Sequence, residues 1–253
     1  VVSPTRLDRR RREGLSYPGA VRSLLLLGLL AASGSCGGGS SSGGADAAAG
    51  ACSAAPDDEL GDGTYYDADG TGNCSFDASP DDLLVAAMNA PDYANAAWCG
   101  ACLEVTGPMG AVTVRVVDQC PGCAHGDLDL SPQAFQKIAP LSAGRVSIMW
   151  HEVACNVAGP IDYHFKDGSN PYWTAIQIRN HRWPIAKFEA MVGSAYRESD
   201  RVDYNYFVDT SGLGTGPFQL RVTDTRGHVV EDSGVALGAD VTRTGTRQFP
   251  SCD

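Results

Sequence analysis

The chain has 253 residues, 43% of them hydrophobic, and a formal net charge of −11 at pH 7. That length allows one or two globular domains. The chain is acidic and contains no cluster of basic residues, so nucleic acid is excluded as a partner. Polyanions such as pectin or teichoic acid are expected to bind poorly, whereas neutral polysaccharides remain possible ligands.

Residues 1–36 are predicted to be an export signal. A basic start contains Arg6 and the run 9–12, and the apolar run Leu24–Leu30 is too short to span a bilayer. Small residues precede Cys36, as in a bacterial lipoprotein signal with Cys36 as the lipidated first residue, although Ser33 stands where that motif prefers leucine. The alternative is ordinary secretion with cleavage nearby. Either way the mature chain is extracytoplasmic, and it touches a membrane only through a lipid anchor.

Residues 37–55 are rich in Gly, Ser and Ala and are predicted to be a flexible tether. Loss of the segment before Cys36 removes six of the 19 basic and two of the 30 acidic residues, which leaves a charge of about −15. The chain has nine cysteines, and setting Cys36 aside leaves an even number suited to disulfides outside the cytoplasm.

A first domain is predicted over residues 56–157. Its expected elements are a short strand at 63–66, a capped helix beginning at Ser79-Pro80 with apolar residues at 83, 84, 87 and 88, a strand at 103–105 and a closing strand at 145–153. Many short strands with two short helices indicate a small β-barrel.

The stretch 111–135 is predicted to organise this domain. Its first strand alternates valines onto one face and ends at Asp118, a tight CPGC turn follows, and strand 127–130 puts its carboxylates on one face and its leucines on the other. Ser131-Pro132 then predicts a helix start. Asp118 and Asp129 are therefore expected at the ends of adjacent elements, as a polar site on a rigid scaffold.

A second domain is predicted over residues 158–253. Segments 162–165, 173–179, 186–191, 218–224 and 228–231 have strand patterns, turns separate them, and no helix pattern is present. This arrangement indicates a β-sandwich.

The order of the motifs GTYY, WCGACLEV, VVDQCPGCAHGDLDLSP, PYWTAIQIRNHRWP and DYNYFV resembles the bacterial and fungal expansins over residues 60–250. The resemblance implies a mainly β protein, with a six-stranded double-psi β-barrel followed by an immunoglobulin-like β-sandwich that binds cellulose. It further implies non-hydrolytic loosening of plant cell walls by a monomer that needs no cofactor.

The resemblance also suggests roles for the acids. The expansin barrel is similar to an inverting endoglucanase, in which Asp129 matches the general acid while Asp118 and Thr64 match polar residues of the glucan groove. The base would fall near Asp67, but on a regular strand Thr64 and Tyr66 share a face and Asp67 points away, so the base is predicted to be missing unless a bulge re-aims it. The plainer alternative is that both acids are turn and cap residues.

One departure from the family concerns the groove aromatics. Well-known bacterial expansins carry a tyrosine where this chain has Cys120, and the CPGC form is more similar to the fungal loosenins. Tyr65, Tyr66 and Trp98 are the candidates for the missing sugar platform.

The cysteines allow two interpretations. Cys99-x-x-Cys102 and Cys120-x-x-Cys123 are 17 residues apart and fit a zinc site, while a redox pair is disfavoured because no helix pattern begins at Cys120. Export and the resemblance favour disulfides without a metal. The family implies the pairs Cys74–Cys99 and Cys102–Cys155, which leaves the pairs Cys120–Cys123 and Cys52–Cys252.

In the second domain, Tyr172, Trp173 and Tyr204 match the flat cellulose-binding row of expansins, and Lys166 matches a polar helper. Neighbours on a strand face opposite ways, so Tyr172 and Trp173 need a loop to face one surface, and the proline at 171 favours one. The alternative is that they are core residues, as is predicted for Trp183 and Phe207.

The sequence is compatible with three functions. The first is non-hydrolytic wall loosening on cellulose or a related neutral β-glucan, with xyloglucan and chitin as further polymers. The second is a weak endoglucanase or lytic glycosidase that uses Asp129 with Asp118 or Asp67. The third is a surface adhesin that only binds polysaccharide.

Overall fold

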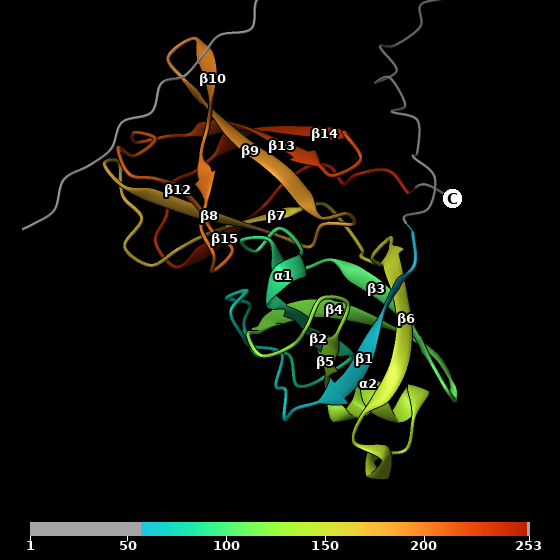
Figure 1. Cartoon of the computed structure of the whole chain (residues 1–253). Coiled ribbons are helices and arrows are strands. Elements are labelled where there is room, and N and C mark those ends of the chain that lie inside the picture. Colours follow the sequence, from blue (N-terminus) through green and yellow to red (C-terminus); the bar gives the residue numbers. More distant parts are fainter. Residues whose placement is uncertain (1–56, 252–253) are drawn as a thin grey trace, which may run out of the picture. The chain divides into compact units, whose positions relative to one another are not determined.

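A computed structural model describes residues 57–251 as a closed β-barrel followed by two further β-sheets (Figure 1). These sheets confirm the predicted mainly β fold class. The predicted signal segment, the tether and residues Cys36, Cys52 and Cys252 lie outside the described residues. No helix in the described part is long and apolar enough to cross a membrane.

Six strands close the barrel in the order β1-β5-β2-β4-β3-β6. Two pairs, β1 with β5 and β2 with β4, are parallel and the other four are antiparallel, which is the arrangement of a double-psi barrel. The strands are β1 Glu59–Tyr65, β2 Val85–Asn89, β3 Cys102–Gly107, β4 Gly110–Cys120, β5 Leu128–Leu130 and β6 Val146–Val153.

The barrel interior is filled by the apolar side of these strands. Val112, Val114 and Val116 of β4 are buried there, as their alternation predicts. The interior is closed by α2 (Pro132–Ile138), whose Phe135 and Ile138 are fully buried. A four-residue helix, α1 (Ala90–Tyr93), and a 3-10 turn, η1 (Leu141–Ala143), complete this part.

The prediction of a helix that begins at Ser79-Pro80 is wrong. A turn occupies this position, in which Ser79 Oγ donates to the Asp82 carbonyl at 2.9 Å, and strand β2 follows. All five residues of β2 are buried, because Ala86 and Met88 belong to the barrel core while Val85 packs in a small cluster elsewhere. A short apolar run with no polar face carries no period that separates a strand from a helix.

The start of α2 is confirmed. Ser131 caps the helix by accepting the Ala134 N–H at 3.1 Å, and Pro132 occupies the first turn. The Ser131 hydroxyl also donates to the carbonyl of Leu83 at 2.5 Å, which ties the segment before β2 to the helix start. One buried hydroxyl therefore joins two chain segments that lie 48 residues apart.

The two remaining sheets pack face to face around an aromatic core (Figure 1). Trp183 and Phe207 are buried in that core, as predicted. The five-stranded sheet contains β11 Asp200–Arg201, β12 Phe207–Asp209, β8 Thr174–Arg179, β7 Asp162–Phe165 and β15 Val241–Thr244; the four-stranded sheet contains β10 Ala195–Glu198, β9 Ile185–Val192, β13 Phe218–Asp224 and β14 Val229–Val235. Strands β10, β11, β12 and β15 were not predicted, because they have two to four residues and little alternation.

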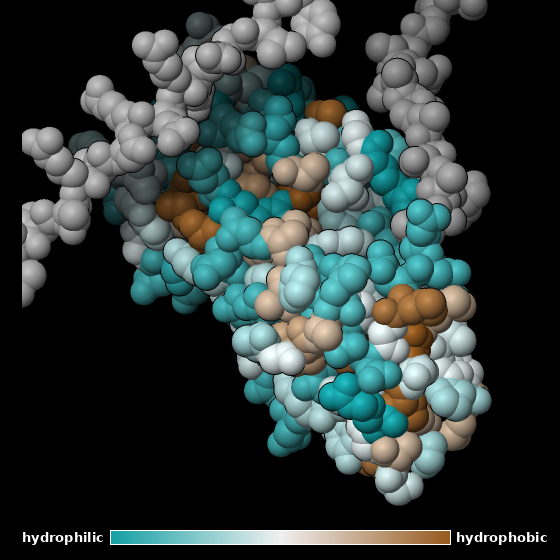
Figure 2. Space-filling view, viewed as in Figure 1, coloured by the Kyte–Doolittle hydropathy of each residue, from teal (hydrophilic) through white to brown (hydrophobic). Residues whose placement is uncertain are grey.

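The outer surface of the barrel changes character along β1. Figure 2 shows hydrophobic surface where β1 and β6 lie, and Leu60 and Met149, which are Cα partners there, are exposed. Leu60 and Thr64 share a face of β1 by period two, so the strand runs from an apolar to a polar outer surface. Thr64 lies at the polar end of β1, where the candidate site begins.

The double role of Ser131 gives a stability test. We expect Ser131→Ala to lower the free energy of unfolding by about 1–3 kcal/mol, because it removes a helix cap and leaves the Leu83 carbonyl without its donor. Urea unfolding measures this loss. Ser142→Ala, in an exposed turn with no capping bond, is the matched control and should stay within about 0.5 kcal/mol of the parent. Equal free energies of unfolding for the two variants would contradict the double role of Ser131 as helix cap and as donor to Leu83.

Candidate functional site

Three of the predicted groove residues lie in one row across the barrel. The Cα partner of Thr64 is Asp129, that of Asp129 is Ala87, and that of Ala87 is Asp118. The two acids are thus separated by strand β2, which is a correction to the expectation of adjacent elements. Two strand spacings place their Cα atoms about 10 Å apart.

Asp129 is the half-buried acid of this row. Its Oδ1 accepts the hydroxyl of Thr64 at 2.6 Å. Burial raises the pKa of the Asp129 carboxyl above its ordinary value, and the charge of Asp118 acts in the same direction, while the Thr64 bond and Arg145 oppose the shift. Asp129 is therefore the acid of this row that holds a proton more readily than an exposed aspartate.

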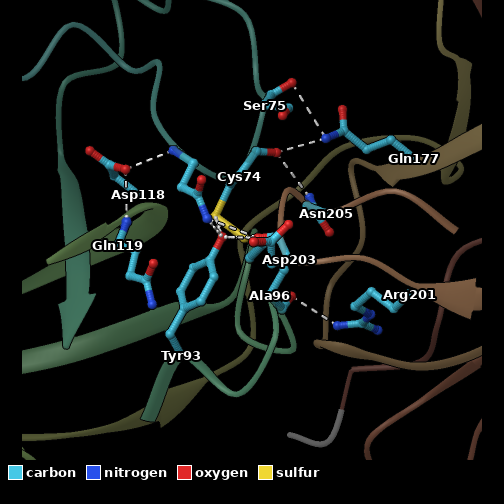
Figure 3. The surroundings of a disulfide bond; sticks show 12 residues. Cys74, Ser75, Tyr93, Ala96, Asp118, Gln119, Gln177, Arg201, Asp203 and Asn205 are labelled. Carbon is cyan, nitrogen blue, oxygen red and sulfur yellow. Dashed lines mark hydrogen bonds between the residues drawn. A yellow bond between two sulfur atoms is a disulfide. The ribbon is translucent and has the colours of Figure 1, made fainter. Parts of the chain in front are cut away.

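Asp118 is held by backbone donors. Its Oδ1 accepts the N–H of Asn73 at 2.6 Å and that of Gln119 at 2.8 Å (Figure 3). Gly72 packs against it so closely that a Cβ there would lie 2.4 Å from the Asp118 side chain. A loop glycine and a backbone amide thus fix this carboxylate in place. Neither residue was identified from the sequence, where GTGN is only a turn signal.

The two candidate tyrosines of the GTYY motif have different surroundings. Tyr65 is partly exposed, and its ring packs on Phe135 with centroids 5.0 Å apart. Tyr66 is half-buried, and its hydroxyl has no hydrogen-bond partner within residues 57–251. Burial raises the pKa of Tyr66, and the negative charges of Asp118 and Asp129 act in the same direction.

Two other candidates lie apart from the row. Trp98 lines a separate cavity with Glu59 and Asp92, and it packs edge-on against Trp150. Asp67, the candidate base, is exposed just beyond the end of β1.

The cysteines form the three predicted disulfides in the described region. These are Cys74–Cys99, Cys102–Cys155 and Cys120–Cys123. The zinc interpretation of the CxxC spacing is therefore wrong, because each of its four cysteines is used in a disulfide. Within residues 57–251, no group of three or more His, Cys, Asp or Glu side chains is placed to hold a metal ion. The third disulfide closes the turn two residues after Asp118.

Tyr172 and Trp173 lie in a tight turn of the second β-structured part. Asn170 and Trp173 pair their backbones across it, with bonds of 2.8 and 3.3 Å, and the Asn170 side chain accepts the N–H of Tyr172 at 2.9 Å. Tyr172 is 82% exposed. The loop that adjacent aromatics require is therefore present, and Tyr172 is not a core residue.

Tyr204 and Lys166 form a second group beside the five-stranded sheet, with Tyr204 in the turn between β11 and β12 and Lys166 just after β7. The Nζ atom of Lys166 lies 5.9 Å from the Tyr204 ring and 5.2 Å from that of Tyr206, and the two rings are 5.9 Å apart. Sequence reasoning missed Tyr206, which the turn before β12 brings beside Tyr204. In the described region no ring contact joins this group to Tyr172 or Trp173.

Asn73 links the acid row to this aromatic group. Its side-chain amide donates to the Tyr93 hydroxyl at 3.0 Å and to the Asp203 carbonyl at 2.9 Å, immediately before Tyr204. The next residue, Cys74, accepts at its carbonyl from Gln177 at 2.7 Å and from Asn205 at 3.2 Å (Figure 3). The loop that holds Asp118 is thus bonded on both sides of Tyr204.

Comparison with known proteins agrees with this architecture. A family profile described as "Lytic transglycolase" matches residues 85–150. Expansin-YoaJ of Bacillus subtilis (strain 168) is 41% identical over 187 residues, which cover 72% of this chain and 80% of that protein. Expansin-B16 of Oryza sativa subsp. japonica is 30% identical over 234 residues, which cover 82% and 86% of the two chains.

A solved structure has the same fold over most of the chain. The crystal structure of a mutant Clavibacter michiganensis expansin in complex with cellohexaose matches with a TM-score of 0.72 and 33% identity, and the match covers 76% of this chain and 98% of that one. The structure in hand is thus of the class that joins a double-psi barrel to a β-sandwich. On sequence, the chain belongs to the expansin family.

The raised pKa of Asp129 gives a prediction about stability and pH. Its protonated form is favoured in the folded chain, so its contribution is full below the unfolded pKa of 3.8 and is lost as pH rises through the folded value. Asp129→Asn removes this loss and keeps an acceptor for Thr64. We therefore expect the stability of the variant relative to the parent to be greater at pH 7 than at pH 3.

Urea unfolding at both pH values measures the difference. The exposed Asp67→Asn serves as the matched control and should show no comparable change between the two pH values. If the free energy of unfolding of Asp129→Asn, relative to that of the parent, falls between pH 3 and pH 7, the raised pKa of Asp129 is contradicted.

Proposed function

We propose that this chain binds cellulose or a related neutral β-glucan and loosens cell walls without cleaving the polymer. The proposal is supported by membership of the expansin family and by the likeness to an expansin in complex with cellohexaose. The observation that carries it is the bonding of one loop, through Asn73, to both the acid row and the aromatic group.

In this proposal the barrel row holds one stretch of glucan. Thr64, Asp129 and Asp118 offer hydroxyl and carboxylate oxygens to sugar hydroxyls. Such groups compete with the hydrogen bonds that neighbouring glucan chains make with each other. Loosening then needs no covalent step, because the bound chain is simply exchanged between two sets of partners.

The aromatic residues hold the polymer surface. Exposed rings hide the apolar C–H faces of sugars from water, and an aromatic side chain can bury roughly 150–250 Å². Tyr172 and Trp173 would supply one contact area, and Tyr204 with Lys166 the other. The two areas suit a long polymer better than a single sugar.

Hydrolysis is the second candidate function. The raised pKa of Asp129 favours it, because a general acid must hold a proton, and the "Lytic transglycolase" profile covers this region. Against it, one oxygen of Asp118, Oδ1, already accepts from two backbone amides, and Asp67 is exposed beyond the end of β1. On the positions of these two acids we assign binding as the function and leave cleavage to the test below.

The site also bears on where the protein works. Its proposed polymer is extracellular, and three disulfides lie in the described chain. We propose export, with Cys36 as a lipid anchor and residues 37–55 as the tether that carries domains 56–157 and 158–253. An adhesin with the same two surfaces would bind equally well and would lack only the loosening.

Asp129→Ala tests the barrel row. We expect wall extension under load to fall by roughly tenfold or more, because the variant removes the half-buried acid at the centre of the row, while cellulose binding remains. Mass spectrometry of the supernatant over amorphous cellulose should show no oligosaccharides from the parent. Soluble product that disappears in the variant would make the protein a glycosidase, and unchanged extension would remove the row from the mechanism.

Trp173→Ala tests the aromatic surface. Loss of one stacking ring should weaken retention on cellulose by roughly 3- to 10-fold without lowering thermal stability. Tyr196→Ala is the matched control, because that ring lies on β10 of the other sheet. Equal pull-down of parent and Trp173→Ala would exclude this residue from the binding surface.

A further inference from the structure

A cleft with both polar and apolar walls includes Phe76, which follows the loop that holds Asp118, and none of the acid-row residues. It has a volume of about 520 Å³ and contains none of the residues assigned above to the groove or to the aromatic surface. Its walls come from the segment just before β2, from β3 and β4, and from the segments around 156 and 180. The residues used below are Phe76, Asp82, Leu84, Arg115, Val157 and His181.

Arg115 is the cation of this cleft. It lies on β4 three residues before Asp118, and its side chain is 28% exposed. The guanidinium lies 5.2 Å from the centre of the Phe76 ring, and its ion pair with the exposed carboxylate of Asp82 is long, at 3.9 Å. Within residues 57–251 the guanidinium makes no hydrogen bond, so its forked donors are available to a ligand in the cleft.

His181 supplies an acceptor in the same cleft. Its Nδ1 lies 2.8 Å from the carbonyl oxygen of Trp183, and because that oxygen can only accept, Nδ1 carries the proton. Burial lowers the pKa of His181 to about 4, which keeps the ring neutral at ordinary pH. Nε2 therefore presents a lone pair, and it borders Gly100, where a Cβ would come within 2.6 Å.

We propose that this cleft binds a single uronic-acid residue carried by an otherwise neutral glycan. The carboxylate accepts from the Arg115 guanidinium, and a sugar hydroxyl donates to Nε2 of His181. Leu84 and Val157 offer apolar surface to the sugar C–H groups. A fully deprotonated anion such as sulfate fits less well, because it has no donor for the lone pair of His181.

Charge limits the ligand to one acid group at a time. The whole chain has a formal charge of −11, so a polymer with an acid on every sugar is repelled at long range. Asp82 is the acid that lines the cleft, and its side chain is 67% exposed and partly neutralised by Arg115. A lone carboxylate on a neutral chain meets the local positive charge of Arg115 without that repulsion.

The cleft and the acid row share a wall. Phe76, which borders Arg115, follows Asn73 by three residues, and it packs against the small cluster of Ala68, Val85 and Val117. This inference goes beyond the glucan-binding function, because the cleft recognises a charged branch and the row a neutral backbone. It gives the protein a means to distinguish an acid-branched matrix polysaccharide from plain cellulose.

Calorimetry with a defined sugar tests the proposal. The ligand is a xylo-oligosaccharide with one glucuronic-acid branch, compared with the unbranched oligosaccharide of the same length. We expect the parent to prefer the branched sugar, Arg115→Gln to lose this preference by roughly tenfold or more, and Arg115→Lys to keep part of it. Arg221→Gln, which removes the same charge from β13 on the four-stranded sheet, should bind as the parent does.

Three outcomes would overturn the proposal. They are equal affinity for branched and unbranched sugars, an unchanged preference in Arg115→Gln, and inorganic phosphate that binds as tightly as the branched sugar and competes with it. Retention of Arg115→Gln on cellulose, measured in parallel, confirms that the variant is folded. Because that retention depends on Trp173 and not on the cleft, failure of one assay does not imply failure of the other.

Discussion

The hydrogen bonds of Asn73 are the constraint on which both proposed surfaces depend. Its backbone amide fixes Asp118 at 2.6 Å, and its side chain reaches Tyr93 and the carbonyl of Asp203 beside Tyr204. The following Cys74 is covalently tied to Cys99, so the loop is anchored while it makes these bonds (Figure 3). A displacement of this loop would therefore move Asp118 and the backbone beside Tyr204 together. The positions of the acid row and the aromatic group are coupled in this way.

The acid row itself follows from strand register. Because Ala87 pairs with an acid on each side, β2 sets the separation of Asp118 and Asp129, and Ala87 itself is buried between them. Thr64 extends the row by one strand and satisfies one oxygen of Asp129. The barrel thereby holds two carboxylates at a fixed separation on strands, where side chains are positioned more rigidly than on loops.

The parts that could be predicted from the sequence are those that local physics decides. Period two separated Asp129 from its buried leucine neighbours, and the Ser131-Pro132 pair marked a helix start. Strand β2 could not be predicted, because its burial comes from partners distant in the sequence. The roles of Asn73 and Ala87 were missed for the same reason: each depends on contacts with residues that no local pattern brings near, and the family resemblance supplied the disulfide pairs that spacing alone left open.

Burial costs folding free energy at two side chains of the barrel, Tyr66 and Asp129. A hydroxyl that is buried without a partner, as Tyr66 is within residues 57–251, costs folding free energy. Burial also opposes ionisation of the neighbouring Asp129. The cost at Asp129 falls when a ligand brings a hydroxyl group that donates to its carboxylate, whereas the Tyr66 hydroxyl is enclosed by protein and lies out of a ligand's direct reach. Each glucan unit carries several such hydroxyls, so binding can recover stability that the empty site forgoes, and the gain arises from hydrogen-bond exchange without any need for bond cleavage.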